Sequence, residues 1–87
     1  MNVISEPELV LVVRSKVLKN LYIIQTHEGK YRITVNLKNH EEVLELVTFR
    51  KTPREWASLD RLVRHMQRKY TGIPSAILTF YSGEATR

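Results

Sequence analysis

Residues 58–70 read Ser-Leu-Asp-Arg-Leu-Val-Arg-His-Met-Gln-Arg-Lys-Tyr, and they carry the firmest secondary-structure signal in the chain. Its apolar side chains fall at i, i+3, i+4, i+7 and i+11, which is one stripe of an amphipathic helix: Leu59, Leu62, Val63, Met66 and Tyr70. Ser58 suits the N-cap, and Asp60 is favourable in the first turn. Thr71-Gly72-Ile73-Pro74 ends the helix, because glycine caps it and proline cannot continue it.

An earlier start of this helix competes with Ser58. Thr52-Pro53-Arg54-Glu55 has the spacing of a capping box, with proline at the first helical position. We favour Ser58 as the cap, with Trp56 pointing into the core just before it.

The chain before residue 58 predicts strands. Residues 9–17 are rich in β-branched side chains and become alternating at their end, which favours a strand. Lys19-Asn20 is a plausible turn, and residues 21–26 form a second strand. His27-Glu28-Gly29-Lys30 makes a tight connection in which Gly29 is free to take positive φ.

Residues 30–37 alternate cleanly, with Tyr31, Ile33, Val35 and Leu37 on one face. This pattern predicts a half-buried antiparallel strand with one wet face. Residues 43–50 are ambiguous between strand and helix, and we choose a strand because a meander extends naturally into it.

Residues 76–81 form the last predicted strand. The predicted fold is therefore α+β, an antiparallel sheet of about five strands in the order β-β-β-β-α-β with one helix on its apolar face. No crossover in this predicted order requires a parallel pair. We expect one domain over residues 1–87, with loosely ordered ends at 1–7 and 82–87.

The amino-acid composition limits the classes of protein to which this chain can belong. Hydrophobic residues make up 43% of the chain and charged residues 26%, which are ordinary globular values. The absence of cysteine excludes disulfides, thiolate catalysis and sulfur-ligated zinc. The apolar run Leu9–Val13 is too short for a signal peptide core or a membrane span. We therefore expect a cytoplasmic protein that does not bind membranes.

The net charge of +5 is concentrated in one region. Acids and bases cancel over residues 1–49 and again over 71–87, whereas residues 50–70 hold seven bases against Glu55 and Asp60. Arg61, Arg64 and Arg68 fall at i, i+3 and i+7, opposite the apolar stripe, with Lys69 and His65 beside them. Asp60–Arg64 is the one i,i+4 pair of opposite charge on this helix. Such a row suits a phosphate backbone or an acidic protein surface, although a plain solvated helix face has equal weight on general grounds.

Three further bases, Arg50, Lys51 and Arg54, lead into the helix and could extend the patch along a loop. The alternative is that these bases keep an edge strand soluble, and we favour that alternative for Lys51. The candidate anion-binding residues are those of the loop and the helix together: Arg50, Arg54, Arg61, Arg64, Arg68 and Lys69.

No pattern of catalytic, metal-binding or cofactor-binding residues is found. His27, His40 and His65 have no metal-binding spacing, and we expect exposed polar side chains at all three. The glycines are isolated, and the serines lie in no nucleophile-elbow pattern. We therefore predict a non-enzymatic protein without a cofactor.

The stretch from Phe49 to Asp60, followed by a helix and Gly72-Ile73, resembles a known family. Small accessory proteins of bacterial plasmids and integrative elements, some associated with partition, carry a strand, Arg-x-Phe-x-Ser-Leu-Asp, a helix, Gly-Ile and a final strand. The matching residues here are Arg54, Trp56, Ser58, Leu59, Asp60, Gly72 and Ile73, with tryptophan in place of phenylalanine. The glycine often found before the Pro-Arg pair is absent, and the segment from helix to glycine is longer. The resemblance implies a regulatory, partition or host-interaction protein of a mobile element, and it transfers no catalytic residue.

Two functions follow as expectations. The first is a regulatory accessory protein that binds nucleic acid, DNA in preference to RNA, through the basic helix face. The second is a protein–protein interaction module, homodimeric through an edge strand or directed at an acidic partner.

Overall fold

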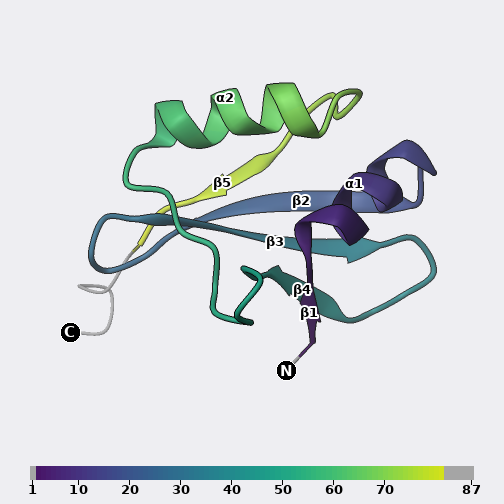
Figure 1. Ribbon diagram of the computed structural model, residues 1–87, viewed down its shortest axis with the longest axis horizontal. Helices are drawn as coiled ribbons and strands as arrows, with labels where there is room; N and C mark the ends of the chain where they lie inside the picture. The colour runs from purple at the N-terminus through teal and green to yellow at the C-terminus, as the bar shows by residue number, and fades with distance from the viewer. Residues whose placement is uncertain (1, 82–87) are drawn as a thin grey trace.

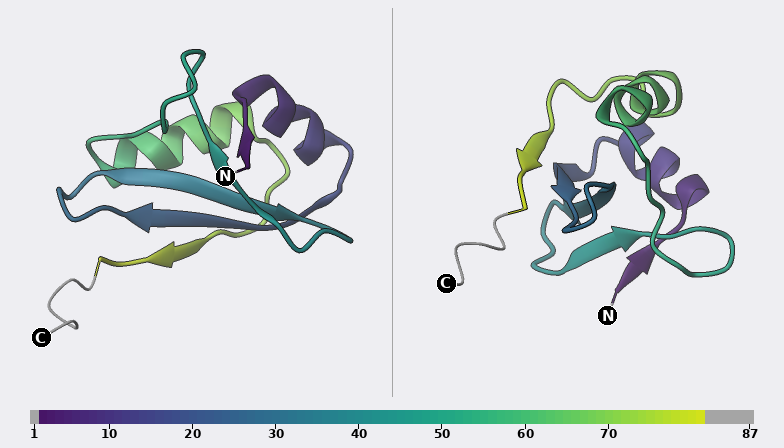
Figure 2. Two further views of the ribbon diagram at one scale, coloured as in Figure 1. Left: turned by 90° about the horizontal axis from the view of Figure 1, so that it is seen from below. Right: turned by 90° about the vertical axis from the view of Figure 1, so that its left-hand side faces the viewer.

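The computed structural model describes residues 2–81 and shows a five-stranded sheet with two helices on one face (Figures 1 and 2). The strand order across the sheet is β1-β4-β3-β2-β5. The elements in chain order are β1 (Val3–Ile4), α1 (Glu6–Arg14), β2 (Leu18–Gln25), β3 (Tyr31–Leu37), β4 (Val43–Leu46), α2 (Leu59–Lys69) and β5 (Ile77–Thr79).

The sheet is mixed, which corrects the prediction of a purely antiparallel one. The central pairs β2–β3 and β3–β4 are antiparallel, whereas both edge strands pair in parallel, β1 with β4 and β5 with β2. Strands β1 and β2 therefore run in one direction and are joined by α1, and β4 and β5 are joined by α2 in the same way. Parallel strands need such crossovers, and the helices supply them.

Helix α1 replaces the strand predicted over residues 9–17, so the chain has two helices and not one. Its N-terminus is a capping box: the Ser5 N–H donates to Glu8 Oε1 at 2.9 Å, and the Glu8 N–H donates to Ser5 Oγ at 3.4 Å. The backbone and then the hydroxyl of Ser5 lower the pKa of Glu8. Leu9 is fully buried, and Val12 and Val13 pack beside it at helical spacing. The cap and this buried stripe outweigh the β propensity of the valines.

Other boundaries differ from the predicted ones. Residues 3–7, expected in a loose end, supply β1 and the first turn of α1. Lys19-Asn20 lies inside β2 at a register shift, and the turn falls earlier, where Lys16 has φ 61°. Strand β4 stops at Leu46 and not at residue 50. The predicted polar tail at 82–87 lies outside the described residues.

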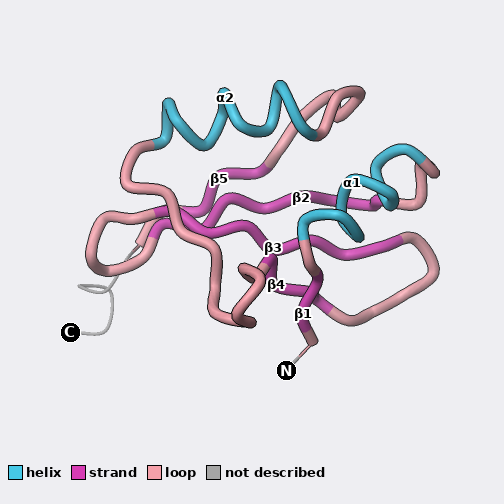
Figure 3. The backbone as a smooth tube through the Cα atoms, in the orientation of Figure 1, coloured by secondary structure: helices cyan, strands magenta, loops and turns pink. Residues whose placement is uncertain are grey.

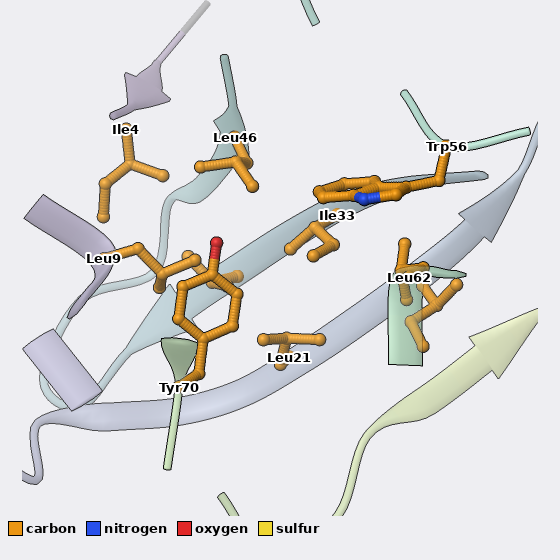
Figure 4. Packing of buried hydrophobic residues seen from close by; sticks show 10 residues of the cluster. Ile4, Leu9, Leu21, Ile33, Leu46, Trp56, Leu62 and Tyr70 are labelled. Carbon is orange, nitrogen blue, oxygen red and sulfur yellow. The ribbon is translucent and has the colours of Figure 1, made fainter. Parts of the chain in front are cut away.

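The core lies between the sheet and the helices (Figure 4). Ile33 and Val35 are fully buried on the predicted apolar face of β3. Trp56 is 8% exposed, which confirms its expected place in the core. Between β4 and α2 the chain is irregular (Figure 3), but Trp56 exchanges two backbone hydrogen bonds of 2.9 Å with Tyr31. The chain thereby fills the place beside β3 that the short β4 leaves free, and this fixes where α2 begins.

Candidate nucleic-acid interface

Helix α2 is held firmly on the sheet. It starts at the expected cap, where Ser58 Oγ accepts a hydrogen bond of 3.2 Å from the Arg61 N–H. Leu62 is 0% exposed and Tyr70 is 1% exposed. Val63, predicted in the apolar stripe, is instead 37% exposed, and His65 takes a place in the interior. The buried stripe is therefore rotated toward His65.

The opposite side of α2 presents three arginines to solvent. Arg61, Arg64, Arg68 and the neighbouring Lys69 are all exposed. Within residues 2–81, none of these four side chains takes part in an ion pair. We call the three arginines and Lys69 the arginine face. Its charge is available to an incoming anion, because no carboxylate of the described chain neutralises it.

The two acids of this region leave the arginine face free. Asp60 is exposed, and the Asp60–Arg64 pair expected from the spacing is not among the ion pairs formed. Glu55 is held elsewhere, because the Arg32 guanidinium binds it at 2.7 Å and Lys30 lies 3.9 Å away. Glu55 thus balances charge on β3 and its preceding turn.

Arg54 is not part of the arginine face. Its guanidinium lies 3.7 Å from Glu6 Oε1 and stacks 4.7 Å above the centre of the Trp56 ring. The Arg54 guanidinium, which was predicted to bind a ligand, instead forms an ion pair and a cation–π contact within the protein.

Arg50 is also separated from α2. It is exposed on the loop 47–53, which projects near β4 and β1 at one edge of the sheet, whereas α2 runs near β5 and β2 toward the other edge (Figures 1 and 2). Phe49 on the same loop is 98% exposed. The structure thus brings together four of the six predicted residues and leaves Arg50 and Arg54 apart.

A buried polar cluster beneath α2 was not predicted. His65, expected to be exposed, is 7% exposed, and its Nε2 is bonded to Glu6 Oε2 at the start of α1. The Tyr70 hydroxyl donates to the same carboxylate oxygen at 3.1 Å. The His65 ring packs against Trp56 at 5.2 Å between centroids. The one available signal was the position of His65, three residues after Leu62 on the inward side of α2.

This polar cluster joins the two helices and raises the pKa of one of its members, Tyr70. Burial, with the nearby negative charge of Glu6, raises the pKa of Tyr70 far above its usual value of 10.0. Tyr70 therefore remains a neutral donor. The Glu6 carboxylate at the start of α1 thus contacts His65 of α2, Tyr70 at the end of α2, and Arg54.

No model of a known protein family matches the chain, and neither curated proteins nor solved structures give a match. Over the described residues, no three histidine, aspartate or glutamate side chains cluster as a metal site would require. None of the helices formed by residues 2–81 has the length and apolar character needed to cross a membrane.

Proposed function

We propose that this chain binds nucleic acid, DNA in preference to RNA, through the arginine face of α2. The observation that carries the proposal is that Arg61, Arg64 and Arg68 are exposed together on one helix with no carboxylate of the described residues paired to them. Guanidinium groups bind phosphate oxygens with two parallel hydrogen bonds, and this geometry favours Arg over Lys.

The role of such a contact is to position the protein on a nucleic-acid backbone. Phosphate contacts supply affinity and orientation but carry no base sequence. We therefore assign to this face a general, salt-sensitive attraction. Its setting in a regulatory or partition-associated accessory protein of a mobile element is part of the same proposal and rests on the sequence resemblance around Ser58 and Gly72.

Charge reversal tests the proposal directly. In a protein carrying Arg61→Glu, Arg64→Glu and Arg68→Glu, binding to a fluorescent DNA duplex should be lost, because three phosphate contacts become repulsions. In the wild-type protein, these three contacts should make the slope of log K against log salt more negative by about 2.7, at about 0.9 per phosphate. Circular dichroism should show the same fold, since all three side chains are exposed.

The matched control replaces the same three arginines by lysine. Charge is kept while the two-pronged hydrogen bonding is lost, so the lysine protein should retain the salt slope with a weaker affinity. Wild-type DNA and RNA affinity in the glutamate protein would refute the proposed function.

A second candidate, a protein–protein interaction module, is favoured by apolar surface near β5. Ile77 is 47% exposed and Phe80 is 68% exposed. A groove of about 390 Å³ runs between α2 and the chain leading into β5, with Val63 and Met66 in its lining. Light scattering separates the candidates: a stable dimer that ignores nucleic acid supports the second, and a monomer with salt-sensitive DNA binding supports the first.

A further inference from the structure

A second group of basic side chains surrounds a hollow of about 410 Å³ at the end of the molecule where both helices stop. Arg14 ends α1, Lys16 lies in the turn that follows, and Lys38 directly follows β3. The opposite wall is the loop 71–74 that leaves α2. Figure 1 shows these segments gathered at one end of the ribbon. Charge counting missed this group, because its bases are cancelled along the sequence by acids that lie elsewhere in the fold.

The three bases of the hollow are unpaired. Arg14, Lys16 and Lys38 are exposed, and none belongs to an ion pair with another described residue. Glu41 and Glu42 are on the same connection as Lys38, but they do not line the hollow. The carbonyl ends of α1 and α2 together carry about one negative charge, which offsets one of the three bases. The hollow therefore keeps an excess of positive charge.

Lys16 occupies a backbone position at which the fold alone would favour glycine. Its φ is 61°, in the left-handed region, and it closes α1 with hydrogen bonds from Lys16 N–H to the Val13 carbonyl at 3.1 Å and from Val17 N–H to the Val12 carbonyl at 3.3 Å. Glycine is the usual residue at this place in such a helix ending. A charged side chain is thus present at a backbone position where glycine would be less strained.

The end of α2 connects the arginine face with the hollow. The last turn of α2 carries Arg68 and Lys69, and Thr71 two residues later is part of the wall. The basic groups of the helix therefore lie within a few residues of the hollow along the chain. The Thr71 hydroxyl adds a neutral donor beside the three charged ones.

We propose that this hollow binds a phosphate group of the same nucleic-acid strand that the arginine face contacts. This inference rests on the proposed function and adds to it a second contact, in a hollow of the surface. The hollow fixes one phosphate from several directions with donors from three segments of the chain, whereas the arginine face holds the backbone along an open surface. Charge-assisted hydrogen bonds to phosphate are the strongest that these groups form.

The experiment compares Lys16→Gly with a matched control, Lys51→Gly. Lys51 is also exposed and also has positive φ, at 71°, but it lies on the loop 47–53, away from the hollow. Both changes remove one charge and relieve one strained backbone position. The measurement is anisotropy of a labelled mixed-sequence DNA duplex over a range of salt, with thermal unfolding of each protein. Lys16→Gly should weaken binding about three- to tenfold and reduce the magnitude of the salt slope by about 0.9. Its melting temperature should be no lower than that of the wild type.

Lys51→Gly should leave affinity and slope unchanged, and Arg14→Gln with Lys38→Gln should repeat the loss seen for Lys16→Gly. Wild-type binding by Lys16→Gly, or an equal loss in both glycine proteins, would overturn the role of the hollow. The charge reversal of the arginine face decides the proposed function independently. A glutamate protein that binds normally removes that function, whereas a normal Lys16→Gly protein beside an inactive glutamate protein removes only the hollow.

Discussion

Replacing Glu6 by alanine should destabilise the fold strongly. The carboxylate bonds His65, which is 7% exposed, and accepts from Tyr70, which is 1% exposed. Leaving a buried hydrogen-bonding group without its partner costs about 1–3 kcal/mol, so two such groups would cost about 2–6 kcal/mol. The Glu6 side chain itself is 26% exposed, which lets water reach part of the cluster and places the expected cost nearer 2–4 kcal/mol.

Urea unfolding followed by fluorescence is a suitable assay, because Trp56 is the single tryptophan of the chain and lies against His65. With a urea dependence of about 1–1.5 kcal/mol per M for a small domain, the midpoint should fall by about 2 M. Glu6→Gln keeps an oxygen acceptor of the same shape and should cost about half as much.

A double-mutant cycle with Tyr70→Phe shows whether the cluster is the cause. Once the Tyr70 hydroxyl is gone, Glu6→Ala removes fewer bonds, so the two costs should fall short of additivity by about 1 kcal/mol. A midpoint shift below about 0.5 M for Glu6→Ala, or strictly additive costs, would contradict the reasoning that Glu6 links α1 to α2.

Two further predictions concern the same end of the chain and the same cluster. Ser5→Ala removes the N-cap oxygen of α1 and should lower the free energy of unfolding by about 1 kcal/mol, which urea unfolding can measure; an unchanged midpoint would deny the cap any role. The raised pKa of Tyr70 means that the unfolded chain loses this proton first, so its contribution to stability is complete below pH 10.0 and declines as the pH rises above it. Unfolding experiments at increasing alkaline pH should therefore show a steeper loss for wild type than for Tyr70→Phe, and parallel curves would count against a buried, Glu6-bound hydroxyl.

Helix α2 and strand β3 could be predicted because each carries a long, regular pattern. The apolar spacing from Leu59 to Tyr70 and the cap at Ser58 agree with one another, as does the alternation from Tyr31 to Leu37. Their local preference and their tertiary packing indicate the same structure, so the presence of both elements could be predicted.

Helix α1 was missed although its signal was present. Ser5 and Glu8 have the capping-box spacing, with Pro7 between them, but the valine-rich run that follows favoured a strand. The same spacing at Thr52–Glu55 caps no helix, because Pro53 pairs with Val47 and Trp56 pairs with Tyr31 as extended chain. Whether a short capping motif starts a helix therefore depends on how much apolar surface the residues after it can bury.

The parallel edge strands and the polar cluster could not be predicted from local patterns. Val3 pairs with Glu45, and Tyr22 pairs with Ile77, over separations that no short window includes. Glu6 and His65 are likewise joined only by the fold. The separation of Arg50 and Arg54 from the arginine face has the same origin, since closeness along the chain did not become closeness in space.

The shortness of the two edge strands affects how copies of this protein can associate. β1 has two residues and β5 has three, so within residues 2–81 each border of the sheet offers only a few free backbone groups. A neighbouring chain that joined there would gain a short ladder of hydrogen bonds, too small to hold a lasting pair. Concentrated solutions should accordingly resist growth into extended β assemblies, and self-association would have to depend on side chains such as Phe80.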